Sequence, residues 1–177
     1  MERYTYIVTS DIHGDGAVLQ EIVDRAASLN ASRILIAGDL CPKSPSMSLI
    51  LHNAPCPYVA VKGNCDWMWD FKDSGLAIPR EQAYLACPDG HHVAMTHGHN
   101  IVDPSGFPFP LADGDILIQG HTHVPQLDRD CNGVIHLNPG SPTRPRSGYK
   151  ATYAVISESS IEVRKLKGDK VVLSLSR

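Results

Sequence analysis

Short apolar runs alternate with amphipathic segments in the first third of the chain. Continuous apolar stretches predict three buried strands, at residues 4–10, 33–38 and 57–63. Residues 16–29 place their apolar side chains on one stripe with helical spacing, and Asp15 is a candidate N-cap for this helix. Residues 46–54 predict a second, shorter helix. This alternation of strands and helices is typical of an α/β domain.

Strands follow one another without clear helices in the second half of the chain. They are predicted at residues 83–87, 91–97, 115–120, 126–130, 133–138, 151–157 and 161–166. An Asp-Gly turn at 89–90 and an Asn-Gly turn at 132–133 predict two β-hairpins. We expect a mixed sheet, or two packed sheets, flanked by helices. The Pro- and Gly-rich stretches at 101–114 and 138–148 predict surface loops of a single domain that spans residues 1–177.

The composition narrows the class of protein and of partner. The chain has 177 residues, a net charge of −3 and no block of charges of one sign, so we expect one sizeable core and no nucleic-acid polymer as a partner. It lacks a secretory signal and any apolar run near the ~18 residues of a membrane span, which predicts a cytoplasmic protein without a membrane partner. Five scattered cysteines without a Cys-x-x-Cys pair predict free thiols. The composition leaves open whether the chain forms a homo-oligomer.

Five of the apolar strands end in side chains that can bind a metal. These side chains are Asp11 and His13, Asp39, Asn64, His97 and His99, and His121 and His123. The loops at the carboxyl ends of strands converge in α/β sheets, so we expect the clusters to meet. The residues of each pair, Asp11/His13 and His121/His123, stand two positions apart, so an extended backbone would direct both side chains of a pair to one face. A glycine directly precedes Asp39, Asn64 and His121, and allows a sharp turn and a close backbone approach.

The set of ligands points to two metal ions. With His99 in reserve, it holds two carboxylates, one amide oxygen and four imidazoles, too many for one tetrahedral zinc and too few for two closed structural sites. Two ions that share a bridging ligand fit this number, and nitrogen and oxygen ligands without thiolate suit manganese, iron, zinc or nickel. Two cations about 3.5–4 Å apart activate a bridging water and neutralise phosphoryl oxygens. The pattern therefore indicates hydrolysis of a phosphate ester.

Six motifs occur in one order along about three quarters of the chain. They are SDIHG (10–14), GDL (38–40), GNCD (63–66), THGH (96–99), GHTH (120–123) and NPGS (138–141). In these motifs the chain resembles the calcineurin-like metallophosphoesterases, and within them the YfcE-like phosphodiesterases of bacteria and archaea. The resemblance implies a sandwich of two mixed β-sheets flanked by helices. It also implies hydrolysis of small phosphodiesters by in-line attack of a hydroxide that bridges two divalent transition metals, for which we expect manganese first, with zinc, iron or nickel as alternatives.

The resemblance also implies a role for individual residues. One metal would be held by Asp11, His13, Asp39 and His123. The other would be held by Asp39, Asn64, His97 and His121, with Asp39 as the bridge. Catalytic roles are expected for Asp39, Asn64, Cys65, Asp66 and His99, and substrate contacts for Asn64, His99 and Arg146.

Cys65 departs from the pattern of the wider superfamily. Many relatives carry a histidine after the Gly-Asn of the third motif, whereas this chain has a cysteine, as in the YfcE-like branch. A thiol is a weak hydrogen-bond donor and a poor general acid at neutral pH. The remaining alternatives are substrates with good leaving groups, or a proton supplied by His99 or by water.

Residues near the motifs have both structural and functional interpretations. Asp66 would orient His97 or His121 as an outer-shell acceptor, or cap the segment that follows it. Trp67 and Trp69 would line the cleft, or pack a short irregular segment.

Arg144 and Arg146 follow NPGS in a proline-rich loop, where each guanidinium would contact a phosphate or remain solvated. A non-catalytic scaffold on the same fold, like the retromer subunit that resembles this family, is expected to have lost ligands, and none is missing here. A structural metal module is expected to close its sites, whereas this set leaves positions open. A phosphomonoesterase with a different physiological substrate remains the alternative to a phosphodiesterase. The short chain shows no inserted cap, so we expect an open cleft.

Overall fold

The first sheet is built around three parallel strands from the apolar runs of the N-terminal third. The computed structural model describes residues 4–177. In it β1 (Thr5–Thr9), β2 (Arg33–Ile36) and β3 (Tyr58–Ala60) lie parallel, and β9 (Thr152–Ser157), β10 (Ser160–Lys165) and β11 (Val171–Ser176) continue the sheet antiparallel from β1. The strand order is β11-β10-β9-β1-β2-β3. β11 is not among the predicted strands. It is a half-buried edge strand, so its apolar pattern is too short to mark it in the sequence.

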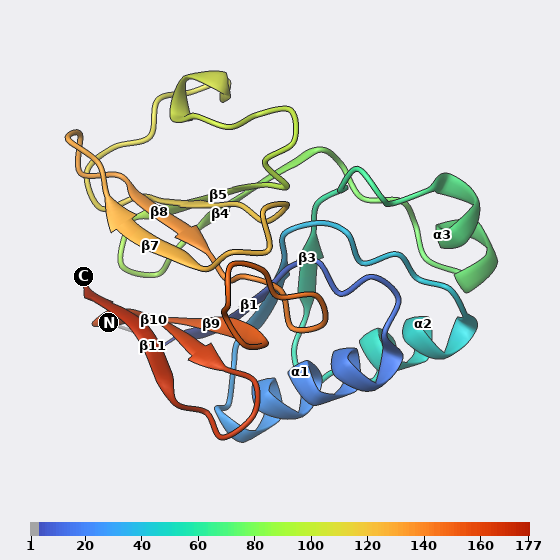
Figure 1. The fold of residues 1–177 in the computed structure, drawn as a ribbon. Helices are drawn as coiled ribbons and strands as arrows, with labels where there is room; N and C mark the ends of the chain where they lie inside the picture. The colour runs from blue at the N-terminus through green and yellow to red at the C-terminus, as the bar shows by residue number, and fades with distance from the viewer. Residues whose placement is uncertain (1–3) are drawn as a thin grey trace.

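Two helices cover the outer face of this sheet (Figure 1). They are α1 (Gly16–Ser28) and α2 (Pro45–His52), close to the predicted bounds. The carboxylate of Asp15 accepts a hydrogen bond from the backbone N–H of Val18 at 3.0 Å, which confirms the predicted N-cap. The buried stripe of α1, which includes Leu19 and Ile22, packs in one cluster with Ile34 of β2. No helix within residues 4–177 is long and apolar enough to span a membrane.

The second sheet contains both predicted hairpins. Its strands, in spatial order, are β4 (Gln82–Ala86), β5 (His92–Thr96), β6 (Ile116–Ile118), β8 (Ile135–Asn138) and β7 (Gln126–Arg129). The pairs β4–β5 and β7–β8 are antiparallel, whereas β5, β6 and β8 run parallel. Within residues 4–177, no α-helix packs against the outer face of this sheet. Phe107, in the loop around the 3₁₀ turn Pro104–Gly106, packs there against Leu117 and Val134.

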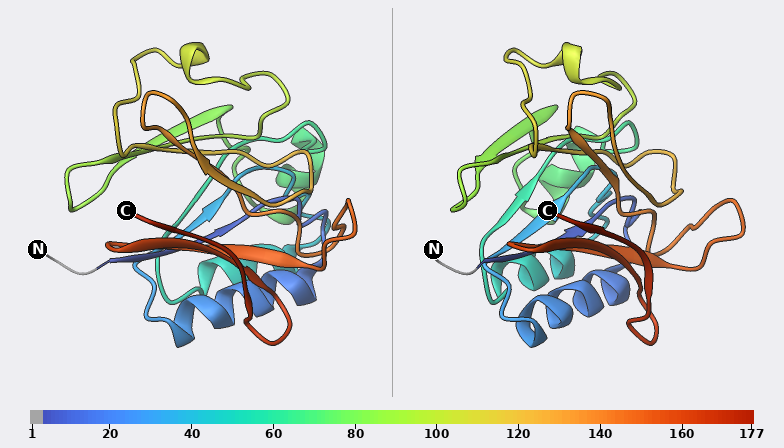
Figure 2. Two further views of the ribbon diagram at one scale, coloured as in Figure 1. Left: turned by 60° about the vertical axis from the view of Figure 1, so that its left-hand side comes forward. Right: turned by 90° about the vertical axis from the view of Figure 1, so that its left-hand side faces the viewer.

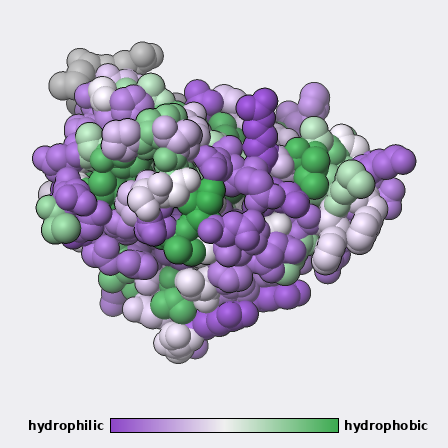
Figure 3. Space-filling model, turned by 90° about the horizontal axis from the view of Figure 1, so that it is seen from above, coloured by the Kyte–Doolittle hydropathy of each residue, from purple (hydrophilic) through white to green (hydrophobic). Residues whose placement is uncertain are grey.

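The main core lies between the two sheets, which are stacked in both views of Figure 2. Val8 and Leu35 from the first sheet and Met95 and Ile118 from the second are fully buried in it. Burial of such a side chain stabilises the fold by about 1.5–3 kcal/mol. The face shown in Figure 3 is mainly hydrophilic, with hydrophobic residues in small separate groups. These contacts confirm the predicted class, a sandwich of two mixed sheets flanked by helices, although long helices cover only one of the sheets.

Candidate metal centre

The carboxyl ends of strands from both sheets meet at one edge of the sandwich. The ring Nδ1 of His97, directly after β5, lies 2.7 Å from the carbonyl oxygen of Ala37, directly after β2. The backbone N–H of Gly120, after β6, donates to the carbonyl of His97 at 3.1 Å. The backbone N–H of Asp11, after β1, donates to the carbonyl of Gly38 at 3.0 Å. This network brings the metal-binding motifs together, as the sequence analysis predicts.

Several of the candidate ligands have a left-handed backbone rather than an extended one. Their φ angles are 56° at Asp11, 50° at His13, 52° at Asp39, 69° at His121 and 61° at His123. The side chains of Asp11 and His13 therefore converge because the loop coils, and the expectation that an extended strand aligns them is wrong. Each such conformation costs about 1–3 kcal/mol and persists only where the surroundings fix it.

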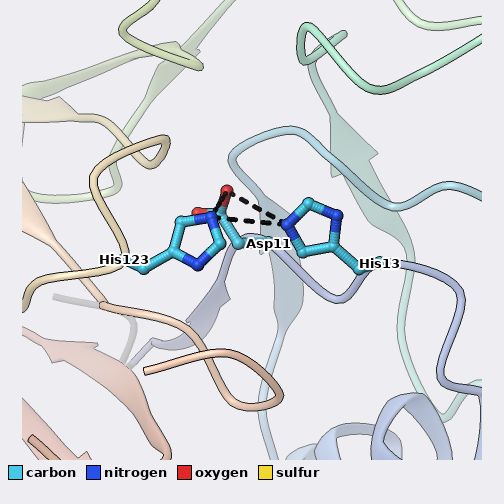
Figure 4. A group of neighbouring side chains, drawn as sticks. All are labelled: Asp11, His13 and His123. Carbon is cyan, nitrogen blue, oxygen red and sulfur yellow. Dashed lines mark hydrogen bonds and ion pairs between the residues drawn. The ribbon is translucent and has the colours of Figure 1, made fainter. Parts of the chain in front are cut away.

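Asp11, His13 and His123 form a first group of ligand atoms (Figure 4). Nε2 of His123 lies 3.2 Å from Oδ1 of Asp11 and 3.4 Å from Nε2 of His13. Oδ1 of Asp11 is buried and has no hydrogen-bond partner among residues 4–177. Nδ1 of His123 donates to the carbonyl of Arg144 at 2.7 Å, so the neutral ring presents an unprotonated Nε2 to Asp11 and His13. Two ring nitrogens and an unpaired carboxylate oxygen that face one another fit a cation.

Asp39, Asn64, His97 and His121 form a second group. Oδ1 of Asn64 lies 3.1 Å from Nε2 of His97 and 2.9 Å from Nδ1 of His121. Oδ2 of Asp39 lies 3.4 Å from Nε2 of His97. The same oxygen lies 3.8 Å from Nε2 of His13, which belongs to the first group. Asp39 therefore lies between the two groups.

The charges in the centre reinforce this arrangement. Burial opposes ionisation of Asp39, but the His97 ring and the N–H of Cys65 outweigh it and hold the pKa of Asp39 at about 2. Burial also disfavours a charged His97, yet the carboxylate of Asp39 and the carbonyl of Ala37 raise the pKa of His97 above its ordinary value. For His13 burial prevails and lowers the pKa. The centre thus contains an ionised carboxylate and two imidazoles, those of His97 and His123, whose Nδ1 is fixed by a carbonyl group.

The carboxylate of Asp66 binds backbone N–H groups and not a histidine ring. It is buried, and its carboxylate accepts hydrogen bonds from the N–H groups of Asp39 at 3.0 Å, Gly63 at 2.8 Å and Cys41 at 2.8 Å. The N-cap residue of α3 (Met68–Ser74) is Trp67, and no side chain forms a capping hydrogen bond there. Asp66 therefore positions the loops that carry Asp39 and Cys41, which corrects both expected roles, orientation of a histidine and capping of the following segment.

Three polar side chains to which the sequence analysis gave no role form hydrogen bonds with the loops that carry the ligands. The hydroxyls of Ser141 and Thr143 donate to the carbonyl of Asp11 at 2.8 and 2.9 Å. The amide of Asn138 donates to the carbonyl of Gly120 at 2.8 Å. The NPGS motif, which includes Asn138 and Ser141, was the available sequence signal for these contacts.

A cavity of about 430 Å³ opens onto both groups. Its lining residues are His13, Asp39, Asn64, Cys65, His121, His123, Arg144, Pro145 and Arg146. Burial, together with the carboxylate of Asp39, raises the pKa of the Cys65 thiol to about 11. The thiol is therefore protonated at neutral pH. The cavity is open to solvent and combines ligand atoms with guanidinium groups, as a phosphate-binding site requires.

His99 lies beside the ligands but outside the set of residues that lines this cavity. Its ring centre is 5.4 Å from that of His97 and 6.2 Å from that of His121. Its Nε2 lies 3.0 Å from the amide nitrogen of Asn100. Burial and the neighbouring His97 lower the pKa of His99.

Trp67 and Trp69 neither pack an irregular segment nor line the cavity. The segment forms α3, and the two indoles stack on each other with ring centres 5.2 Å apart and planes 5° from parallel. Trp67 is 53% exposed and Trp69 is 57% exposed. Both expected roles are therefore corrected: the indoles form an exposed pair at the start of the helix.

A model of the calcineurin-like phosphoesterase superfamily domain matches residues 5–160. The chain belongs to this superfamily. Phosphodiesterase YfcE of Escherichia coli is 27% identical over 180 residues, which cover 94% of this chain and 95% of that protein. Probable metallophosphoesterase YsnB of Bacillus subtilis is 30% identical over 156 residues, 85% of this chain and 82% of that protein. The predicted resemblance to YfcE-like members of the superfamily is confirmed.

Solved structures agree with the fold. The structure of YfcE from Escherichia coli superposes with a TM-score of 0.85 at 24% identity and covers 97% of this chain and 98% of its own. A predicted phosphoesterase from Streptococcus pneumoniae superposes with a TM-score of 0.71 at 26% identity and covers 100% of this chain and 99% of its own. The chain therefore has the phosphoesterase fold over its described length.

Proposed function

We propose that this chain is a metal-dependent phosphodiesterase that hydrolyses small phosphodiesters at a dinuclear metal centre. The observation that carries the proposal is the position of Asp39, whose Oδ2 faces His97 at 3.4 Å and His13 at 3.8 Å. One carboxylate oxygen directed at both ligand groups is the arrangement that a shared, bridging ligand requires. The similarity to the phosphodiesterase YfcE supports the choice of a diester.

The donor set supports two metals. Asp11, His13, Asp39 and His123 would hold one ion, and Asp39, Asn64, His97 and His121 would hold the other. Nitrogen and oxygen donors without thiolate suit manganese, our first choice, and also zinc, iron and nickel. When bound, two such ions supply Lewis acidity that neutralises phosphoryl oxygens and lowers the pKa of water.

The residues of the chain position the ions and the substrate. The carbonyls of Ala37 and Arg144 fix the rings of His97 and His123. Arg146 lines the cavity, where its guanidinium would give an anionic substrate a positively charged contact. Asn64 lines the same cavity and turns its amide nitrogen towards Cys65, 3.2 Å from Sγ.

Departure of the leaving group receives little help from the chain. The high pKa of Cys65 keeps its thiol protonated, but a thiol is a weak donor. The lowered pKa of His99 makes this ring a poor proton source at neutral pH. We therefore propose substrates whose leaving groups are stable as anions.

A metal titration with two chromogenic substrates tests the proposal. Protein freed of metal by a chelator is mixed with bis(p-nitrophenyl) phosphate or with p-nitrophenyl phosphate while manganese is added. We expect hydrolysis that depends on metal and favours the diester. A preference for the monoester would instead indicate a phosphomonoesterase, and metal binding without hydrolysis of either ester would indicate a scaffold.

A further inference from the structure

The loop that carries Arg144 and Arg146 is fixed to the metal centre. The carbonyl of Arg144 accepts a hydrogen bond from Nδ1 of His123 at 2.7 Å, and the N–H of Arg144 donates to the hydroxyl of Ser141 at 2.9 Å. The N–H of Arg146 donates to the carbonyl of His123 at 3.3 Å. Pro145 between the two arginines restricts the backbone further. The backbones of both arginines are therefore held in place by hydrogen bonds with His123.

Both arginines line the 430 Å³ cavity, and neither is neutralised by the chain. Among residues 4–177, no carboxylate lies within 4 Å of either guanidinium, and neither side chain donates a hydrogen bond within the protein. Other arginines differ: Arg164 pairs with both Glu162 and Asp169. Two arginines that line one cavity and form no ion pair among residues 4–177 are thus available to a ligand.

The positive charge exceeds what hydrolysis of a simple diester requires. Two divalent ions would balance the carboxylates of Asp11 and Asp39, the attacking hydroxide and the single negative charge of a phosphodiester. Arg144 and Arg146 then add two positive charges beyond this balance. A phosphate monoester carries about −1.5 to −2 charges at neutral pH and offers three acceptor oxygens, enough for two guanidinium groups.

We propose that Arg144 and Arg146 form a second phosphate-binding subsite beside the metal centre, and that the substrate is a small phosphodiester that also carries a terminal phosphate. This inference rests on the proposed function, because the metal centre must hold the diester that reacts. It assigns to Arg144 a specificity-determining role.

Two p-nitrophenyl esters that differ only in the second phosphate test this subsite. They are thymidine 5′-(p-nitrophenyl phosphate) and the same ester with a 3′-phosphate, and release of nitrophenolate by the manganese-loaded protein is followed. We expect kcat/KM to be about tenfold higher for the 3′-phosphorylated ester, the effect of about one charge-assisted hydrogen bond. In Arg144→Gln this ratio should fall towards one. Lys150→Gln, an exposed change in the same loop and outside the cavity, is the matched control and should keep the ratio.

Binding provides a readout that does not depend on turnover. In titration calorimetry, thymidine 3′,5′-bisphosphate should bind the loaded wild-type protein about tenfold more tightly than thymidine 5′-phosphate, and Arg144→Gln should remove the difference. Equal affinities, or a preference that survives in Arg144→Gln, would overturn the subsite. Loss of hydrolysis of both esters with the binding preference intact would instead refute the proposed function alone.

Discussion

The Nε2 atoms of His13 and His123 face each other across 3.4 Å, although 110 positions separate the two residues in the sequence. The carbonyl of Arg144 accepts a hydrogen bond from Nδ1–H of His123, so the Nε2 of this ring is unprotonated in its neutral form. Oδ1 of Asp11 lies 3.2 Å from this nitrogen without a hydrogen-bond partner within the described chain. A cation satisfies all three atoms at once, which is why we interpret this constellation as a metal site.

Asp39→Asn should abolish turnover more completely than any change at an outer position. Asparagine keeps the shape of the side chain but loses the charge that both ions would share. We expect kcat to fall by more than the roughly 10- to 100-fold that is typical when an outer-shell partner is lost. His99→Gln, next to the ligands but outside the cavity, is the matched comparison. Near-normal turnover of Asp39→Asn in excess manganese would refute the bridging role.

Gly63→Ala should displace the same carboxylate without removing it. A Cβ atom at Gly63 would collide with Oδ1 and the backbone nitrogen of Asp39. We expect manganese affinity, measured by calorimetry, to fall about as far as in Asp39→Asn. At Gly16 a Cβ atom meets Met47 at 3.7 Å and Ile50 at 3.9 Å, which are ordinary contacts, so Gly16→Ala is the control and should retain affinity. Full metal binding by Gly63→Ala would show that Asp39 tolerates movement.

Cys65→His should help only substrates with poor leaving groups. The pKa of Cys65, about 11, keeps the thiol protonated, yet a thiol donates weakly, whereas an imidazolium is an efficient general acid. General acid catalysis contributes about 10²–10⁴-fold, so the slope of log kcat against leaving-group pKa should become shallower in this variant.

The rates are measured with aryl diesters of graded leaving-group pKa in wild type, Cys65→His and His99→Ala. If His99 already supplies the proton, His99→Ala steepens the slope and Cys65→His leaves it unchanged. That outcome would contradict our interpretation of Cys65.

The ionised carboxylate of Asp89 should stabilise the fold at neutral pH and lose this effect in acid. From the turn of the β4–β5 hairpin, its Oδ2 accepts a hydrogen bond from the hydroxyl of Tyr4 at 2.6 Å and lies 2.9 Å from Nη1 of Arg177. Burial opposes its ionisation, but Tyr4, the backbone N–H of His91 and Arg177 outweigh burial and lower the pKa of Asp89 below its ordinary value. The stabilisation is thus complete above the unfolded pKa near 4 and is lost as the pH falls through the lower folded value.

Urea unfolding of wild type and Asp89→Asn at pH 7, 5 and 3 measures this contribution. The difference in free energy of unfolding should be similar at pH 7 and 5 and smaller at pH 3. A difference that stays constant down to pH 3 would mean that the charge of Asp89 contributes nothing.

The strands and the gathering of the ligands are predictable because both follow from local pattern. Apolar runs mark β1, β2 and β3, and the polar residue that ends each run lies at the carboxyl edge of the sheet by geometry alone. The left-handed backbones of Asp11 and His13 carry no such mark, because neither residue type prefers that conformation as glycine does.

Long-range contacts account for the other differences. Asp66 accepts hydrogen bonds from the backbone of Asp39 and Cys41, 27 and 25 positions away, and a backbone N–H leaves no trace in the sequence. The place of Arg144 on the cavity wall depends on its carbonyl contact with His123, 21 positions away. Trp67 and Trp69 stack on each other at the surface, so their apolar character does not show that they belong to the core or line the cavity.

The number of metal ions bound per chain tests the dinuclear centre most directly. Protein purified without chelator, dialysed against manganese and then against metal-free buffer, is measured by elemental analysis beside Asp39→Asn. We predict about two transition-metal ions per wild-type chain and a clear loss in the variant. A well-folded wild-type protein that holds no metal after exposure to manganese or zinc, or only one, would contradict the dinuclear centre.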